Sequence, residues 1–120
     1  MAPELKPVYL VAGSDRPKVA RAIRRLRDRL GVDAAELLSA TDTRGEASVA
    51  ACNSLGLFTE EARLVVVEDV ERWRADDAKA VAAYLQSPAP ATVLALVGEG
   101  VKADSALAKA CAKAGELLVY

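Results

Sequence analysis

Residues 53–69 read Asn-Ser-Leu-Gly-Leu-Phe-Thr-Glu-Glu-Ala-Arg-Leu-Val-Val-Val-Glu-Asp, and this stretch decides the fold. It opens at the end of a predicted helix and closes on a strand whose core, Leu64–Val67, is apolar at every position. A half-exposed strand alternates apolar and polar residues, whereas a continuous apolar run is typical of a strand covered on both faces. The stretch therefore predicts a parallel sheet with helices on both sides.

The rest of the chain repeats this alternation of apolar strands and amphipathic helices. Strict strand–helix alternation favours right-handed crossovers and a doubly wound arrangement. We therefore predict an α/β fold, a three-layer αβα sandwich with a five-stranded parallel sheet. The expected strands are Val8–Ala12, Glu36–Ala40, Arg63–Glu68, Thr92–Val97 and Glu116–Tyr120, and the expected helices span about 16–30, 44–55, 77–86 and 105–114.

Local signals mark where several of these helices begin and end. Asp15 is a typical N-cap for the first helix, and Gly31 is a typical stop. Thr43 and Glu46 have the spacing of a capping box at the start of the second helix. Asp104 is expected to cap the fourth helix.

The composition describes one ordinary globular domain of 120 residues. Hydrophobic residues make up 52% and charged residues 28%, which excludes a disordered chain. The net charge of −1 argues against a domain that coats nucleic acid by bulk electrostatics. The start lacks the pattern of a signal peptide, and no apolar run approaches the ~18 residues of a membrane span. We expect a cytoplasmic protein without membrane contact.

The turn after the first strand, residues 13–20, lies where a phosphate-binding loop would lie in such a fold. A P-loop needs Gly-x-x-x-x-Gly-Lys-Ser/Thr. Counted from Gly13, the last three required positions hold Lys18, Val19 and Ala20. Pro17 also removes a backbone amide from the turn. We therefore expect a degenerate P-loop without nucleotide.

Two acidic patterns resemble catalytic motifs without completing them. Glu68 and Asp69 follow an apolar strand as in a Walker B motif, in reversed order and without a P-loop. Asp15, Asp69 and Lys102 loosely match a phospho-receiver site, but its second acid is missing. A nucleotide-binding domain, ATPase-like or receiver-like, remains the alternative function.

Histidine is absent, which excludes Ser/His and Cys/His nucleophilic sites and histidine-ligated metals. Cys52 and Cys111 have no metal-ligand spacing and are expected to be small buried thiols. We predict no catalytic residues, no metal and no cofactor.

Two features have both a structural and a functional interpretation. Leu57 and Phe58, a large apolar pair in a polar turn, either staple the turn to the core or form a docking anchor for another protein. The first helix is strongly basic, which indicates either a solvated face or a contact surface for DNA phosphate or an acidic partner. Its seven basic residues are Arg16, Lys18, Arg21, Arg24, Arg25, Arg27 and Arg29, with Arg21, Arg24 and Arg25 as the candidate contacts.

Four stretches together resemble the delta subunit of the bacterial DNA polymerase III clamp loader. These are the opening strand and turn at 7–15, the helix end and Leu-Phe pair at 53–58, the apolar strand at 63–67, and the proline-rich lead at 88–94. The resemblance spans nearly the whole chain, in order. Where the family often has glutamine before the Leu-Phe pair, this chain has Asn53, Leu55 and Gly56.

The resemblance implies an AAA+-like N-terminal domain, residues 1–120, without the ATPase motifs. It implies that Leu55, Leu57 and Phe58 bind the sliding clamp (beta subunit) and help to open it. Implied partners are the clamp, the other clamp-loader subunits and DNA within the complex, as part of the DNA polymerase III holoenzyme. Family members continue into lid and collar domains, so we expect a fragment of a longer chain that is itself monomeric.

Overall fold

A computed structural model describes residues 5–32, 35–55 and 62–120, except for the side chains of residues 54 and 55. Strands and helices alternate as predicted, with one additional short 3-10 helix. The elements are β1 (Val8–Ala12), α1 (Arg16–Leu30), β2 (Glu36–Ser39), α2 (Gly45–Leu55), β3 (Arg63–Glu68), η1 (Val70–Arg72), α3 (Ala75–Tyr84), β4 (Thr92–Gly98), α4 (Ala106–Ala114) and β5 (Glu116–Val119).

The strands form one parallel sheet in the order β2-β3-β4-β1-β5. β1 is a central strand, in register with β4 through Leu10–Leu96 and with β5 through Leu10–Leu117. The five residues of β1 are all buried, as its continuous apolar sequence requires. The prediction of a five-stranded parallel sheet is confirmed.

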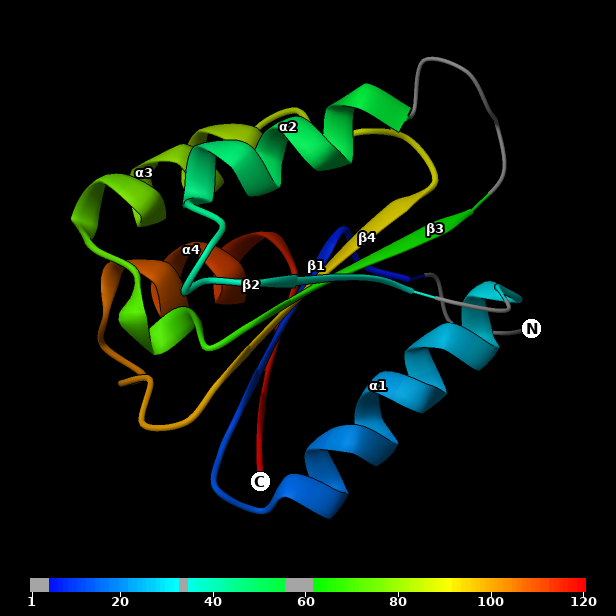
Figure 1. The fold of residues 1–120 in the computed structure, drawn as a ribbon, viewed down its shortest axis with the longest axis horizontal. Helices are drawn as coiled ribbons and strands as arrows, with labels where there is room; N and C mark the ends of the chain where they lie inside the picture. Colours follow the sequence, from blue (N-terminus) through cyan, green and yellow to red (C-terminus); the bar gives the residue numbers. More distant parts are fainter. Residues whose placement is uncertain (1–4, 33–34, 56–61) are drawn as a thin grey trace.

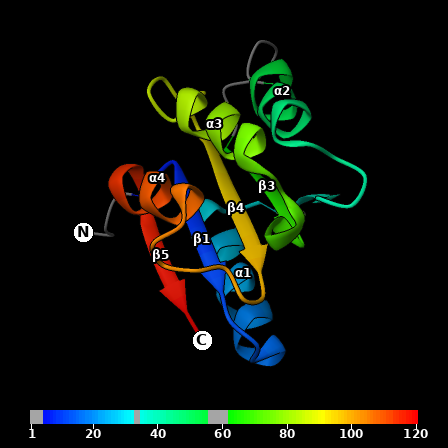
Figure 2. The ribbon, with the colours of Figure 1, turned by 90° about the vertical axis from the view of Figure 1, so that its left-hand side faces the viewer.

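The helices cover the two faces of the sheet unequally, as Figures 1 and 2 show: α1 lies on one face, and α2, α3 and α4 lie on the other. Alternate residues of each strand therefore enter different core clusters. Tyr9 and Val11 pack with Ala22 and Leu26 of α1. The opposite cluster contains Val8 and Leu10 of β1, Cys52 of α2, Val81 of α3, and Leu107 and Cys111 of α4.

The capping of α1 agrees with the sequence prediction. The side chain of Asp15 accepts a hydrogen bond from the amide of Lys18 at 3.2 Å. Gly31 ends the helix in the left-handed conformation, at φ 71°.

The predicted caps of α2 and α4 are wrong. α2 begins at Gly45. The residue that caps it is Asp77 and not Thr43, since the Gly45 amide donates to Asp77 Oδ1 at 2.9 Å. The carbonyl of Thr43 instead accepts a hydrogen bond from the indole of Trp73 at 3.0 Å. α4 is capped by Ser105, whose side chain accepts from the amide of Ala108 at 3.2 Å, so Asp104 is not its cap.

Other element boundaries move by one or two residues. α3 begins at Ala75, before the predicted Asp77, because the Asp77 carboxylate accepts the amide of Arg74 at 2.9 Å and so belongs inside the first turn. It ends at Tyr84 and not at Gln86. β4 is one residue longer than predicted, and β2 and β5 are each one residue shorter.

Candidate functional site

A groove lies at the carboxyl ends of the central strands, where ligands bind in open α/β folds. It has a volume of about 380 Å³ and runs along the side of the sheet that α1 covers. Gly13, Glu68 and Asp69 line it, so the structure brings together three of the four residues of the degenerate nucleotide motifs. Lys18, the fourth, does not line the groove; its Nζ lies 3.7 Å from Asp15 Oδ2.

In a P-loop, backbone amides of the turn point at the phosphates. In this groove, the corresponding amide of Gly13 is already used in a hydrogen bond within the fold. The amide of Gly13 donates to the carbonyl of Gly98 at 3.2 Å and therefore does not point at a ligand. Gly13 has φ 139°, and a Cβ at this position would lie 1.9 Å from the carbonyl oxygen of Tyr120. The glycine thus serves close backbone packing and not phosphate binding.

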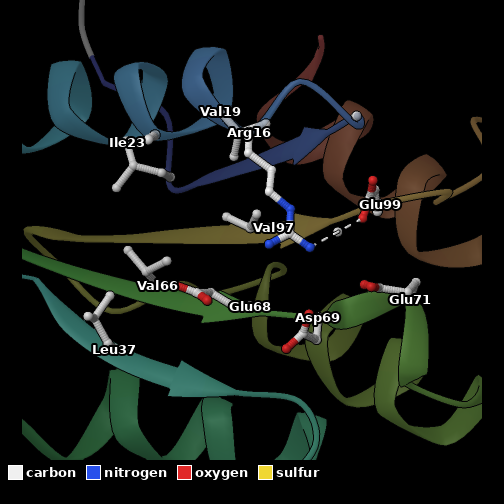
Figure 3. Close-up of a pocket in the computed structure, with 13 residues that line it drawn as sticks. Arg16, Val19, Ile23, Leu37, Val66, Glu68, Asp69, Glu71, Val97 and Glu99 are labelled. Carbon is white, nitrogen blue, oxygen red and sulfur yellow. Dashed lines mark ion pairs between the residues drawn. The ribbon is translucent and has the colours of Figure 1, made fainter.

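Four carboxylates and one guanidinium surround the end of the groove where the strands stop (Figure 3). Asp69 turns the chain there through a left-handed conformation, φ 62°, and leads into η1. Arg16 lies 3.9 Å from Glu99, in an exposed and therefore weak ion pair. An acidic rim repels phosphate, which weighs against the nucleotide-binding alternative. The charged residues of this end are Arg16, Glu68, Asp69, Glu71 and Glu99.

In the described ranges 5–32, 35–55 and 62–120, no three cysteine or acidic side chains are placed to hold a metal ion. Over the same ranges, no helix has the length and apolarity needed to cross a membrane.

The predicted clamp-binding residues fall mostly outside the described part of the chain. Leu57 and Phe58 lie outside the described residues, and Leu55 is the last residue of α2, with no described side chain. Their position in the chain is nevertheless defined, since they connect the end of α2 to the start of β3.

Arg63 fixes the two flanks of this connection. Its Nη2 lies 3.3 Å from Glu36 Oε2 on β2 and 3.5 Å from the carbonyl of Ala51 in α2. Its amide donates to the carbonyl of Ala91 at 2.8 Å. The Arg63 side chain is only 13% exposed. The sequence did not single out this residue, whose partners lie in β2, in α2 and in the turn before β4.

The candidate contact residues of the basic helix, Arg21, Arg24 and Arg25, are all exposed. The opposite face of α1 buries Ala22 and Leu26 against the sheet. α1 therefore presents an outward basic face.

The two cysteines are free and fully buried, as predicted. Burial raises the pKa of Cys52 to about 11 and that of Cys111 to about 12. Burial also raises the pKa of Tyr84 to about 12, and the Tyr84 hydroxyl accepts the amide of Ala89 at 3.2 Å. Cys52, Cys111 and Tyr84 are therefore neutral at physiological pH and packed in the core, which indicates a structural role.

No family model matches this chain, and no curated protein matches it in sequence. Solved structures match it in fold. Its fold is shared with a clamp-loader protein. The DNA clamp loader delta protein of Bacillus subtilis (YqeN) superposes with a TM-score of 0.75 at 21% identity, over 98% of this chain and 39% of that one. A DNA polymerase III gamma subunit-related protein of Thermotoga maritima superposes with a TM-score of 0.62 at 15% identity, over 98% of this chain and 42% of that one.

These two superpositions agree with the sequence resemblance in fold, and they confirm the predicted α/β architecture. The chain spans about two fifths of the length of each of these structures. At these identities the likeness establishes the fold alone.

Proposed function

We propose that this chain is the N-terminal domain of a clamp-loader delta subunit, which binds the sliding clamp and helps to open it during DNA replication. The observation that carries the proposal is the superposition on the Bacillus subtilis delta protein over 98% of the chain. The groove supports it, because a rim of four carboxylates and an occupied Gly13 amide are unsuited to ATP. The domain then acts through binding, in the cytoplasm, within the DNA polymerase III holoenzyme.

The proposed anchor is the Leu57–Phe58 pair, with Leu55 beside it at the end of α2. A buried aromatic residue with an aliphatic neighbour is a typical interface hot spot. The pair falls between α2 and β3, so the periodicity of neither element assigns it to the core. Arg63, at the start of β3, contacts the carbonyl of Ala51 in α2 and so joins the two elements that flank the pair.

Ring opening follows from differential affinity. A ligand shifts an equilibrium only by binding one state more tightly than the other. The pair would enter an apolar pocket on the clamp and favour the form with one loosened interface. ATP would be bound by other clamp-loader subunits.

The test replaces both anchor residues, Leu57→Ala and Phe58→Ala, and measures melting temperature and clamp affinity on the same protein. Burying each side chain in a pocket contributes ~1.5–3 kcal/mol, so losing both weakens binding by roughly 150-fold or more. Val119→Ala is the matched control, since Val119 is an apolar side chain that is 69% exposed on β5. Lost binding with unchanged melting supports the anchor. A fall in melting temperature of several degrees shows instead that the pair staples the core.

A further inference from the structure

The unequal layers of the fold leave β2 uncovered on its α1 face, where Leu37 is exposed, whereas Leu38 packs against the core on the other face. α1 packs over the centre of the sheet, and β2 lies at the sheet edge. Leu37 of β2 pairs in register with Val66 and therefore points to the α1 side. Its side chain is 66% exposed, although a leucine at this place would be expected to pack beneath a helix. The groove begins at this leucine.

The groove has two chemically different ends. Figure 3 shows Leu37, Val66 and Ile23 grouped at one end, with Asp69, Glu71 and Glu99 at the other. The acidic end holds four carboxylates and the single guanidinium of Arg16, so its net charge is −3. The carboxylates are those of Glu68, Asp69, Glu71 and Glu99. The larger apolar residues that line the groove are Val19, Ile23, Leu37, Val66 and Val97.

We propose that this groove docks a segment of a partner protein that carries an arginine or lysine next to a large apolar residue. The cation would lie among the carboxylates, and the apolar side chain would cover Leu37 and Val66. The charge complementarity selects this occupant, because the acidic rim disfavours phosphates and acidic peptides. A metal ion is a poor alternative, since no three acidic side chains in the described part of the chain converge on one point.

The size of the groove is consistent with this occupant. A volume of about 380 Å³ accommodates a few side chains but not a folded domain. β2 pairs with β3 alone within the described residues, so its outer backbone edge is open beside Leu37. An extended segment could thus lie along β2 while its side chains enter the groove.

The experiment titrates the isotopically labelled protein with the synthetic peptide Ser-Arg-Ile-Leu-Lys-Ser and follows backbone amide shifts by NMR. Saturable shifts are expected at Leu37, Glu68, Asp69 and Glu71. Two further peptides, one with both cations replaced by glutamate and one with Ile-Leu replaced by Ala-Ala, should each bind at least tenfold more weakly. Absence of saturable shifts at millimolar peptide, or equal binding of the glutamate peptide, would overturn the proposal.

Variants of the protein test the two ends of the groove separately. The double variant Glu68→Gln with Glu71→Gln should lower the affinity for the cationic peptide by about tenfold or more. The control is Asp28→Asn with Asp42→Asn, two exposed acids outside the groove, which should leave this affinity unchanged. Leu37→Ser should weaken binding, and Val119→Ser, on the other face of the sheet, should not. Equal loss in the control variants would show a non-specific charge effect and refute the site. Sedimentation that shows self-association abolished by Leu37→Ser would identify a second copy as the occupant, and would likewise refute it.

Discussion

The carboxylate of Asp77, in the first turn of α3, accepts a hydrogen bond from the amide of Gly45, the first residue of α2, at 2.9 Å. The same carboxylate accepts the amide of Arg74 at 2.9 Å and the Arg44 guanidinium at 3.1 Å. One buried side chain therefore caps two helices. Gly45 permits this contact, because a Cβ there would lie 2.5 Å from the carbonyl oxygen of Asp77.

Replacing Asp77 with alanine should destabilise the domain by about 1–3 kcal/mol, because it leaves helix-terminal amides without a partner. Asp76→Ala is the control. The Asp76 side chain is 77% exposed and pairs with the Arg44 guanidinium at 3.2 Å, so its loss should change the free energy of unfolding by no more than ~0.5 kcal/mol. Urea denaturation of both variants measures the difference, and equal effects would contradict the shared cap.

The same residue should make stability sensitive to acid. Burial by itself would raise the pKa of Asp77, but hydrogen bonds from Arg74, Gly45 and Arg44 outweigh it and hold this pKa below its usual value. The stabilisation is therefore present above the unfolded-state pKa of about 3.9 and is lost as the pH falls through the lower folded-state pKa. The difference in unfolding free energy between wild type and Asp77→Asn should be constant from neutral pH to about 4 and shrink below it. A difference that stays constant in stronger acid would rule this out.

Magnesium and millimolar ATP should not raise the melting temperature. The Gly13 amide is occupied by Gly98, Lys18 lies outside the groove, and Glu68 and Asp69 add negative charge. Binding at 100 times the dissociation constant would stabilise the fold by ~2.7 kcal/mol, which a thermal-shift assay detects easily. A magnesium-dependent rise of that size would favour the nucleotide-binding alternative.

Both thiols should resist modification in the folded state. Cys52 and Cys111 are fully buried, and burial raises their pKa values to about 11 and about 12. The reactive thiolate is therefore scarce at pH 8, and the sulfur is inaccessible. A thiol-specific chromogenic reagent should react slowly in native buffer and rapidly in guanidinium chloride. Rapid native reaction would show that the core opens locally.

Alanine at Gly115 should be far more damaging than alanine at Gly31. A Cβ at Gly115 would lie 1.8 Å from the carbonyl oxygen of Val8, so β1 and the start of β5 would have to separate. Gly31 has φ 71° with open space around it, so its replacement costs only the left-handed penalty of roughly 1–2 kcal/mol. Thermal unfolding of the two variants compares these costs, and similar melting temperatures would contradict the clash.

The fold was predictable from the sequence because its signals are local. The continuous apolar run of Leu64–Val67, the Asp15 cap and the Gly31 stop each act within a few residues, and the strands and α1 formed where these signals lie. The cap of α2 was not predictable in this way, since Asp77 reaches Gly45 from another helix. The exposure of Leu37 was equally hidden, because the sequence gives no sign that a single helix covers one face.

The candidate sites were predictable to different degrees. Gly13, Glu68 and Asp69 meet at one groove because parallel strands end at a common edge. The role of Arg63 depends on partners in β2 and α2, which no spacing along the chain reveals. Leu57 and Phe58 remain predictions, since they lie outside the described residues.

The position of β1 in the sheet has a consequence for how the protein is made. Leu10 emerges from the ribosome early, but its register partners, Leu96 and Leu117, are synthesised near the end of these 120 residues. Pairing of such distant segments is slow, because the loop between them must close first. Until then the apolar stretch Val8–Ala12 lacks both of its neighbouring strands in the sheet, β4 and β5. The nascent chain thus exposes an aggregation-prone apolar segment for most of its translation. We expect chaperones that bind apolar strands to bind it during that time.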